Sequence, residues 1–285
     1  MKFGFIGLGQ MGGGLARNLI RANKDTLVYD IDPAAIEKTL AAGSTAKAAK
    51  SLKELAEVDV LFTSLPLPKH LNEVMLGEDG LLSNMKKGSV YIDISTIDPL
   101  TARKLADAAA VKGIDFLECP LGKGPVQAET GTAPVFAGGK KEVFDKMKDV
   151  LETASKPVYY CGDVEASAAF KLISNLVGMT NMAVLAEGLK LGEKAGIEPN
   201  VLQELLKETG ANSFQLQIRG PWILNNDFAN RFAVDLALKD VNLGIEMAEA
   251  WEKDLKLCKV AAGYFKEASE KGFGTEDCNA VYKVV

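Results

Sequence analysis

The chain has 285 residues, of which 47% are hydrophobic and 25% charged, close to the average of soluble globular proteins. Its formal charge of -5 and pI of about 5.2 argue against non-specific nucleic-acid binding, which needs a basic surface. No unbroken apolar run of about 18 residues predicts a membrane span, and no signal-peptide pattern is present. We therefore expect a cytoplasmic protein with no nucleic-acid or membrane partner, built as one large or two modest domains.

The cysteines also indicate a reducing compartment. The four of them, Cys119, Cys161, Cys258 and Cys278, include no C-x-x-C pair. A single histidine leaves no Cys/His spacing for zinc. We expect free thiols and no metal site.

Strands and helices alternate along the first half of the chain. The expected strands are 2–6, 26–30, 59–64, 89–93, 114–117, 133–138 and 157–161. The expected helices are 11–22, 33–43, 51–57, 68–76 and 98–112. Such alternation predicts an α/β domain, a Rossmann-type doubly wound parallel sheet, which we assign to residues 1–162.

After residue 162 the sequence predicts helices alone. Residues 164–195 contain no proline and are rich in Ala, Leu, Met and Lys, which predicts one long helix. Further helices are expected at 199–208, 213–224, 234–254 and 257–271. Residues 163–285 should form an all-α domain that the long helix joins to the first. We expect the ligand to bind in a cleft between the two domains.

Residues 7–12 carry the pattern G-x-G-x-x-G between an expected strand and an expected helix. In a dinucleotide-binding turn, Gly7 permits the tight turn, Gly9 lets a pyrophosphate approach the backbone, and Gly12 lets the helix pack on the strand. The helix N-terminus then offers N–H groups to the phosphates. A glycine-rich turn with no ligand is the alternative explanation. We call residues 7–12 the glycine-rich turn.

Asp30 lies 18 residues after Gly12, at the end of the second expected strand. A carboxylate at this position accepts hydrogen bonds from a ribose hydroxyl and repels a 2′-phosphate. No Lys or Arg adjoins it, so we expect NAD (NADH) in preference to NADP. A simple turn aspartate is the alternative.

Carbonyl reduction needs a proton donor beside the hydride acceptor. His70, the single histidine, fits a surface position better, and no Tyr precedes a Lys by four residues. Lys171 is the best candidate because it lies in the apolar segment AAFKLISN, where burial lowers the pKa of a lysine. Asn175 follows one helical turn later and would hold a substrate oxygen. An ordinary helix lysine remains the alternative from these residues alone.

Five segments in chain order resemble the β-hydroxyacid dehydrogenase family, which is 3-hydroxyisobutyrate dehydrogenase-like and part of the 6-phosphogluconate dehydrogenase superfamily. They are FGFIGLGQMG at 3–12, DISTIDP at 93–99, CPLGKGPVQAETGT at 119–132, KLISN at 171–175 and LKDVNLGIEMA at 238–248. The resemblance covers essentially the whole chain. It implies an NAD-dependent oxidoreductase acting on CH–OH groups, a β-hydroxyacid dehydrogenase or semialdehyde reductase.

The resemblance also implies roles for single residues. Lys171 would be the general acid and base, Thr96 would lie beside the nicotinamide ribose, and Lys239 would reach the cofactor with Asp240 orienting it. The residues assigned to the cofactor are Gly7, Leu8, Gly9, Gln10, Met11, Gly12, Asp30, Leu65, Pro66, Thr96 and Lys239. Those assigned to the substrate are Ser95, Gly122, Lys123, Gly124, Asn175 and Asp240.

Residues 119–132, the substrate loop, depart from the family pattern P-V-S-G-G. Gly122 stands where the family has a serine, and Lys123 where it has a glycine. We hypothesise that Lys123 binds a second anionic group at the far end of the substrate, such as a carboxylate, sulfonate or phosphate. A sulfolactaldehyde or a dicarboxylic semialdehyde would fit. The alternative is a lysine that points to water from a mobile loop.

A second departure lies before the catalytic lysine. Glu165-Ala166-Ser167 stands where the family often has glycines, which puts the local backbone in doubt but not the chemistry.

Three other functions stay open. Oxidative decarboxylation is disfavoured because such chains are normally longer at the C-terminus. Imine reductases usually replace the lysine that this chain retains as Lys171. A non-catalytic NAD-binding sensor would not need Lys171, Asn175 and Lys239. The long helix and the helical domain also indicate self-association, and the family resemblance implies a homodimer or homotetramer.

Overall fold

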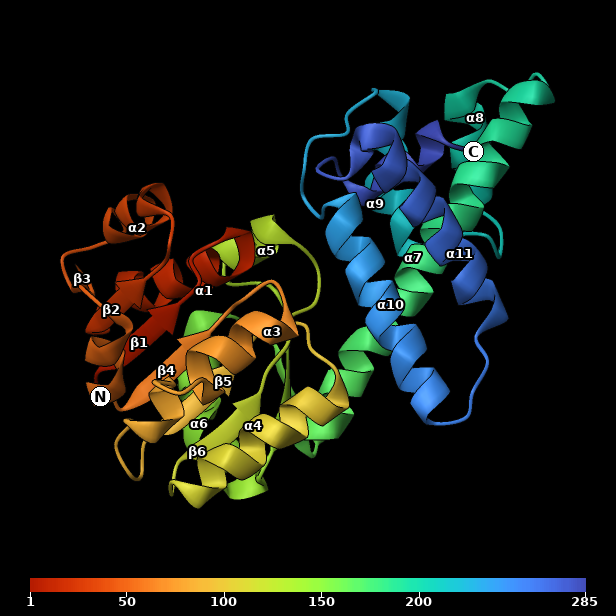
Figure 1. The fold of residues 1–285 in the computed structure, drawn as a ribbon. Helices are drawn as coiled ribbons and strands as arrows, with labels where there is room; N and C mark the ends of the chain where they lie inside the picture. The colour runs from red at the N-terminus through yellow and green to blue at the C-terminus, as the bar shows by residue number, and fades with distance from the viewer. The chain divides into compact units, whose positions relative to one another are not determined.

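The computed structural model describes all residues, Met1–Val285, and divides them into two compact units (Figure 1). The first unit is Met1–Lys171 and the second is Leu172–Val285. The division falls inside the long helix α7 (Val164–Lys194). The domain boundary expected after residue 162 lies just before α7 begins and stays a prediction.

One sheet of eight strands forms the centre of the first unit. The strands are β1 (Phe3–Ile6), β2 (Thr26–Tyr29), β3 (Ala46–Ala48), β4 (Val60–Thr63), β5 (Val90–Asp93), β6 (Asp115–Glu118), β7 (Val135–Gly139) and β8 (Val158–Gly162). Their order is β3-β2-β1-β4-β5-β6-β7-β8, as in a Rossmann-type fold. The seven predicted strands are confirmed. The short edge strand β3 was not predicted, because its sequence Ala-Lys-Ala has little strand preference.

The predicted parallel sheet is confirmed except for one antiparallel pair of strands. Strands β6 and β7 pair antiparallel, while all other neighbouring strands are parallel. In the connection between β6 and β7 the chain folds back, and Leu121 forms an isolated antiparallel bridge with Val135 of β7. A connection that returns in this way reverses the chain direction.

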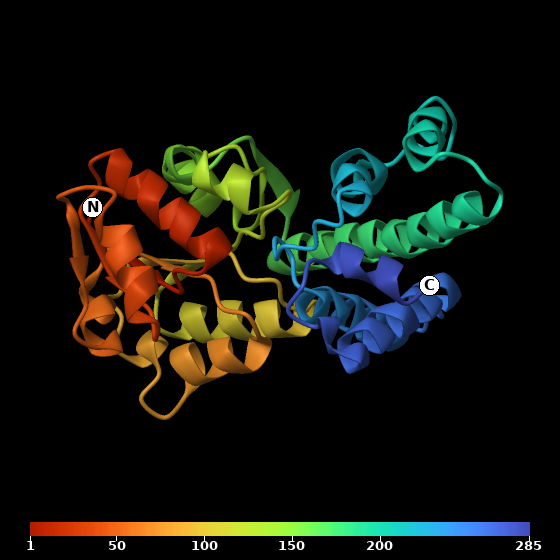
Figure 2. The same cartoon turned by 90° about the horizontal axis from the view of Figure 1, so that it is seen from above.

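Helices cover both faces of this sheet. They are α1 (Gln10–Arg21), α2 (Pro33–Leu40), α3 (Pro68–Leu71), α4 (Pro99–Val111), α5 (Pro125–Glu129) and α6 (Lys141–Ala154). Side chains that alternate along the strands form two apolar layers, one against α1 and α6 and one against α4. Figure 2 shows α1 on one side of the strands and α4 on the other. The fold therefore leaves the carboxyl ends of the strands to the loops that carry the candidate site.

Several predicted helices in this unit need correction. Residues 51–57 form a 3₁₀ helix, Leu52–Glu57, and residues 68–76 form α3 followed by a π-helical turn, Asn72–Leu76. The predicted helix 33–43 ends at Leu40. Helices α5 and α6 were not predicted.

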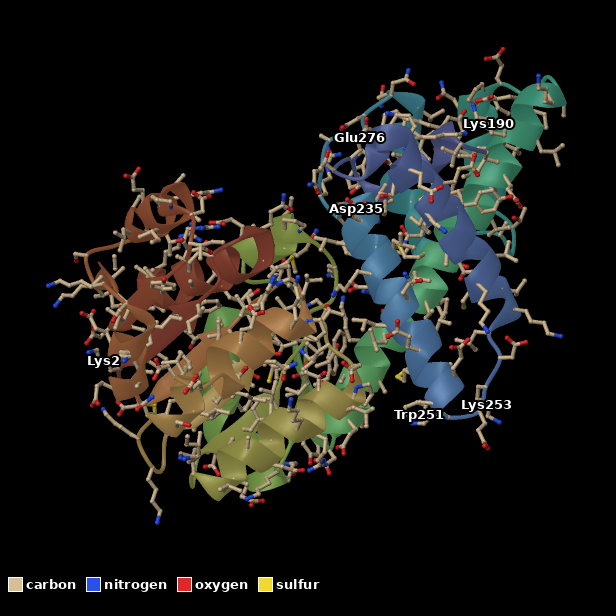
Figure 3. All side chains as sticks on the ribbon, viewed as in Figure 1. Lys2, Lys190, Asp235, Trp251, Lys253 and Glu276 are labelled. Carbon is tan, nitrogen blue, oxygen red and sulfur yellow. The ribbon has the colours of Figure 1, made fainter.

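The second unit is helical, as expected. Its helices are the C-terminal part of α7, then α8 (Pro199–Lys207), α9 (Phe214–Leu224), α10 (Val234–Ala250) and α11 (Lys256–Ala268), followed by the turns Ser269–Phe273 and Cys278–Lys283. Helix α10 ends four residues earlier than predicted, and Figure 3 shows Trp251 and Lys253 in the turn that follows. Glu252 in this turn has a φ of 57°, which a helix cannot continue through.

Helix α7 is long and apolar enough to cross a membrane by length and composition alone. Met179, Met182 and Leu189 of this helix belong to the apolar core of the second unit. The core helix of a soluble protein meets the same criterion, so the length and composition of α7 are weak evidence for a membrane span.

Candidate active site

The glycine-rich turn lies where the strand order reverses, between β1 and β4. In open α/β sheets this position forms the ligand-binding crevice at the carboxyl ends of the strands. The loops after β1 and β4 touch, because a Cβ atom at Gly7 would lie 2.1 Å from the carbonyl oxygen of Ser64. The predicted residues Gly7, Leu65 and Pro66 therefore share one edge of the sheet.

Each glycine of the turn has the geometry that its predicted role requires. Gly7 has a φ of 88°, which favours glycine. A Cβ atom at Gly12 would lie 2.2 Å from the Gly7 carbonyl oxygen, so only glycine lets α1 approach β1 this closely. A Cβ atom at Gly9 would meet no atom within 4 Å. The backbone at Gly9 is thus open on the side where a phosphate would approach.

The N-terminus of α1 suits an anion. Gly9 is the N-cap, no side chain caps the helix, and its first turn contains no acidic residue. Backbone N–H groups in a helix first turn favour negative charge. Gln10 is exposed and Met11 half-buried beside them. These features fit the pyrophosphate of a dinucleotide.

Asp30 and Leu8 interact with each other. The Leu8 N–H donates to Asp30 Oδ2 at 2.6 Å, and the Asp32 N–H donates to Asp30 Oδ1 at 2.8 Å. Asp30 is half-buried, so it has lone pairs left for ribose hydroxyls. The Leu8 side chain is buried in the core, and its N–H is used by Asp30. Leu8 therefore positions Asp30, and its contact with the cofactor stays a prediction.

A buried carboxylate holds the neighbouring loops. Asp93, at the end of β5, accepts hydrogen bonds from the hydroxyls of Thr63 at 2.5 Å and Ser95 at 2.7 Å. Ser95 Oγ in turn accepts the N–H of Leu65 at 2.9 Å. Burial is the main cause that raises the pKa of Asp93 to about 6, against the hydrogen bonds that lower it.

The contacts of Ser95 give it a positioning role. Its side chain is buried and its hydroxyl links β5 to the loop after β4. The substrate contact that we assigned to Ser95 stays a prediction. Thr96, the next residue, is half-buried, and Pro66 is exposed.

Glu118 lies beside Asp93, since the two residues are register partners on β6 and β5. Both oxygens of Glu118, and Oδ2 of Asp93, are buried without a hydrogen-bond partner. Burial and the nearby Asp93 charge raise the pKa of Glu118 well above its usual value, which favours the neutral form of this carboxyl. Sequence reasoning gave neither acid a role, although charged residues inside apolar strands were a visible signal.

The substrate loop leaves β6 through Cys119. A Cβ atom at Gly122 would lie 2.8 Å from Cγ of Pro134 and 3.0 Å from Cε2 of Phe136, which explains why no serine stands here. Lys123 has a φ of 61° and an exposed side chain. Gly124 then caps α5. The loop thus presents a cation from a backbone conformation that costs about 1 kcal/mol or more for a non-glycine residue.

Lys171 and Asn175 lie on α7, one turn apart and hence on the same face. Both are half-buried. In the second unit, Asn175 Nδ2 donates to Asp240 Oδ2 at 2.5 Å, and Lys239 Nζ lies 2.6 Å from Asp240 Oδ1. Asp240 is buried and binds both neighbours. Its contacts match the predicted orienting of Lys239, while its contact with substrate stays a prediction.

No group of three or more His, Cys, Asp and Glu side chains in Met1–Val285 is arranged to hold a metal ion. The four cysteines are free thiols in the structure. His70 is half-buried at the start of α3.

Comparison with known proteins covers both units of the chain. Residues 2–162 match the model of the NAD-binding domain of 6-phosphogluconate dehydrogenase. Residues 166–285 match the model described as NAD-binding of NADP-dependent 3-hydroxyisobutyrate dehydrogenase. The chain belongs to the β-hydroxyacid dehydrogenase family. It is an NAD(P)-binding oxidoreductase that acts on the CH–OH group of small hydroxy acids.

Individual relatives align over the full length. The 2-(hydroxymethyl)glutarate dehydrogenase of Eubacterium barkeri is 36% identical, with 100% of this chain and 94% of the relative covered. The structure of a 3-hydroxyisobutyrate dehydrogenase from Salmonella typhimurium has a TM-score of 0.90 and 32% identity, covering 100% of both chains. An imine reductase from Streptomyces aurantiacus is 17% identical with a TM-score of 0.67, covering 100% of this chain and 99% of its own. That likeness shows the fold alone.

Proposed function

We propose that the chain is an NAD-dependent hydroxyacid dehydrogenase or semialdehyde reductase whose substrate carries a second anionic group. The observation that carries this proposal is Lys123. Its ammonium is exposed, and no carboxylate in Met1–Val285 pairs with it. Backbone strain clusters at ligand-binding sites, so an unpaired cation held at a positive φ, where a glycine would be unstrained, supports a binding role.

The similarity to 2-(hydroxymethyl)glutarate dehydrogenase supports an anionic tail. The compound in the name of that relative is a dicarboxylic acid, with one carboxylate beyond the reacting end. We infer that the substrate of this chain shares this property and that Lys123 forms a charge-assisted hydrogen bond with the distal group.

We propose NAD as the cofactor on the strength of Asp30. Its carboxylate is fixed by two backbone N–H groups, and Asp32 adds a second negative charge two residues away. A ribose 2′-phosphate would meet these charges, whereas a 2′-hydroxyl would donate to Asp30. The kcat/KM for NADH divided by the kcat/KM for NADPH measures this preference. A higher kcat/KM for NADPH than for NADH would contradict it.

The proposed chemistry needs one proton-transfer group. A bound nicotinamide supplies the hydride in reduction and accepts it in oxidation. The Lys171 ammonium gives its proton to the aldehyde oxygen as the carbon gains hydride, and neutral Lys171 takes the hydroxyl proton in the reverse direction. Asn175, on the same face of α7, would hold the substrate oxygen for this transfer. Lys171 recovers its proton from solvent.

The test is the initial rate of NADH oxidation with C3–C5 aldehydes, each with and without a terminal anion. Two variants test the two lysines separately. Lys171→Met keeps the apolar stem without the proton donor, and we expect kcat to fall by about 10²–10⁴-fold. Lys123→Ala should raise KM for anion-tailed aldehydes by about tenfold and leave KM for neutral ones unchanged.

Different results would contradict different parts of the proposal. Equal rates on neutral and anion-tailed aldehydes would keep the dehydrogenase and remove the role of Lys123. NADH binding without turnover of any aldehyde would favour the imine reductase or the sensor instead.

We also propose a cytoplasmic homodimer or homotetramer. The support is an apolar stripe on α7, formed by Ile173, Val177, Val184 and Leu191, each about half exposed or more. These positions fall on one side of the helix, since successive residues turn by about 100°. Light scattering of the purified chain measures the mass, and a monomer at micromolar concentration would contradict the proposal.

A further inference from the structure

Helix α5 fastens the C-terminal part of the substrate loop to α1. Asn18 Nδ2 donates to the carbonyl oxygens of Ala128 and Ala154, both at 2.8 Å. A Cβ atom at Gly14 would lie 2.7 Å from the carbonyl carbon of Ala128, so the two helices are in close backbone contact. Because α5 begins directly after Gly124, its position determines where the loop ends.

A cluster of three charged residues, Arg17, Arg21 and Glu129, also joins α5 to α1. Arg17 Nε lies 2.9 Å from Oε2 and 3.1 Å from Oε1 of Glu129, and Arg17 Nη2 also donates to Oε2. Arg21 Nη2 donates to Oε1 at 2.5 Å and Arg21 Nη1 to the Glu129 carbonyl oxygen at 3.2 Å. Hydrogen bonds from Arg17 are the main cause that lowers the pKa of Glu129 to about 2, so this carboxylate is charged.

The buried position of Arg17 makes Glu129 hard to replace. Arg17 is 5% exposed, and besides Glu129 it contacts the Thr39 hydroxyl at 3.4 Å. A buried guanidinium without its carboxylate is strongly unfavourable. The cluster therefore ties α5 to α1 in one arrangement.

The other end of the loop is fixed by the sheet. Leu121 forms a bridge with Val135, and the Gly122 N–H donates to the Pro134 carbonyl oxygen at 2.8 Å. Gly122 also packs against Phe136. Lys123 thus lies on a short span between two anchors, one in the sheet and one on α1.

We propose that Arg17, Arg21 and Glu129 are positioning residues that set Lys123 relative to the bound cofactor. Helix α1 carries the glycine-rich turn at its N-terminus and the two arginines farther along. One rigid helix therefore fixes the position of the substrate loop relative to the glycine-rich turn. Loss of Glu129 lets α5 shift and releases the span that holds Lys123. The consequence for substrate binding rests on the proposed function of Lys123, but the anchoring of the loop does not.

The anchoring is tested by limited trypsin digestion of the whole protein, followed by mass spectrometry. Trypsin cleaves after Lys123 when the span is mobile, and the bond after Lys112, at the end of α4, serves as the internal reference. We expect Glu129→Gln to speed cleavage after Lys123 by about fivefold or more relative to that reference. Equal rates at Lys123 in the variant and the unchanged protein would overturn the proposal.

A second variant controls for general destabilisation. Glu165→Gln removes one of the carboxylates that Arg103 binds between α4 and α7, and Glu165 is 37% exposed, as is Glu129. Arg103 itself is more exposed than Arg17 and keeps Asp163 as a partner. It should leave the relative cleavage after Lys123 unchanged. Faster cleavage there in both variants would assign the effect to loosening of the whole unit.

The functional part is tested by a double-mutant cycle between positions 129 and 123. We expect Glu129→Gln to raise KM for an anion-tailed aldehyde by about fivefold, with KM for NADH and kcat on a neutral aldehyde unchanged. In a Lys123→Ala background, Glu129→Gln should change neither the KM for the anion-tailed aldehyde nor the KM for NADH. Additive effects, or an equal loss on neutral aldehydes, would show that Glu129 does not act through Lys123.

The two experiments fail independently. If the unchanged protein shows no preference for anion-tailed aldehydes, the proposed function fails, and the digestion still decides whether Glu129 anchors the loop. If the preference exists but the cycle shows no coupling, the positioning role fails and the proposed function stands.

Discussion

The glycine-rich turn has glycine where the backbone requires it, whereas the substrate loop has Lys123 at a position where glycine would be unstrained. In the turn, Gly7 and Gly12 are required by backbone atoms that lie closer to their Cβ positions than any side chain allows. In the loop, Lys123 occupies a φ of 61° that glycine would adopt without strain. The turn is thus determined by packing, whereas the loop keeps a residue that packing does not favour.

The difference indicates where specificity resides in this chain. A backbone that binds a phosphate needs the same atoms for every substrate, so strict glycines serve it. A loop that selects a substrate gains from a charged side chain even at a cost in stability. Three predictions test this contrast, beginning with the largest expected effect.

The first compares two glycines of the turn. In Gly12→Ala the new methyl would lie 2.2 Å from a backbone oxygen, so we expect at least about 3 kcal/mol of destabilisation or no folded protein. In Gly9→Ala the methyl meets nothing within 4 Å, so the free energy of unfolding should hardly change while the Kd of NADH rises about tenfold or more. Chemical denaturation and fluorescence titration measure the two quantities. Normal NADH binding by Gly9→Ala would contradict the open phosphate position.

The second concerns Asp93, which holds the loop after β4 through Ser95. Its folded pKa of about 6 is above the usual aspartate value of 3.8, so its stabilising contribution is complete below pH 4 and is lost as pH rises through 6. At about 1.4 kcal/mol per pH unit the loss is about 3 kcal/mol. Asp93→Asn cannot titrate at this position, so the stability of the unchanged protein relative to the variant should fall by this amount between pH 4 and 7.

Urea denaturation of both proteins across this pH range measures the difference. Burial raises the pKa of the neighbouring Glu118 in both proteins, and the Asp93 charge raises it further in the unchanged protein alone. A constant difference between the two proteins would mean that Asp93 does not change its charge in this window.

The third and smallest effect is at Lys123. Lys123→Gly removes the strain of the positive φ and should raise the free energy of unfolding by about 1 kcal/mol, while preference for anion-tailed aldehydes is lost. Lys123→Ala keeps the strained backbone, so it should lose the preference without gaining stability. Thermal unfolding of the two variants separates the effect of backbone strain from the effect of the lost charge. Equal melting temperatures would show that the positive φ at position 123 does not destabilise the protein.

Much of this fold was predictable because its signals are local. Apolar strands followed by amphipathic helices predicted seven of the strands and the Rossmann-type sheet, and G-x-G-x-x-G with Asp30 predicted the dinucleotide site. The antiparallel direction of strand β7 was missed, because the direction of a strand depends on how its connection returns. The edge strand β3 and helices α5 and α6 were also missed. The roles of Lys171 and Asn175 were inferred from an apolar helix segment and strengthened by the family resemblance, and that of Lys239 came from the resemblance; all three remain predictions.

The sequence by itself determined the class of fold, the glycine-rich turn and the identity of the unusual lysine, since each is written in a short run of residues. The tertiary structure alone decided which distant residues meet. Arg17 reaches Glu129 across 112 positions, and Asp93 lies beside Glu118 on the next strand. Such contacts depend on the packing of whole elements, and no local pattern encodes them.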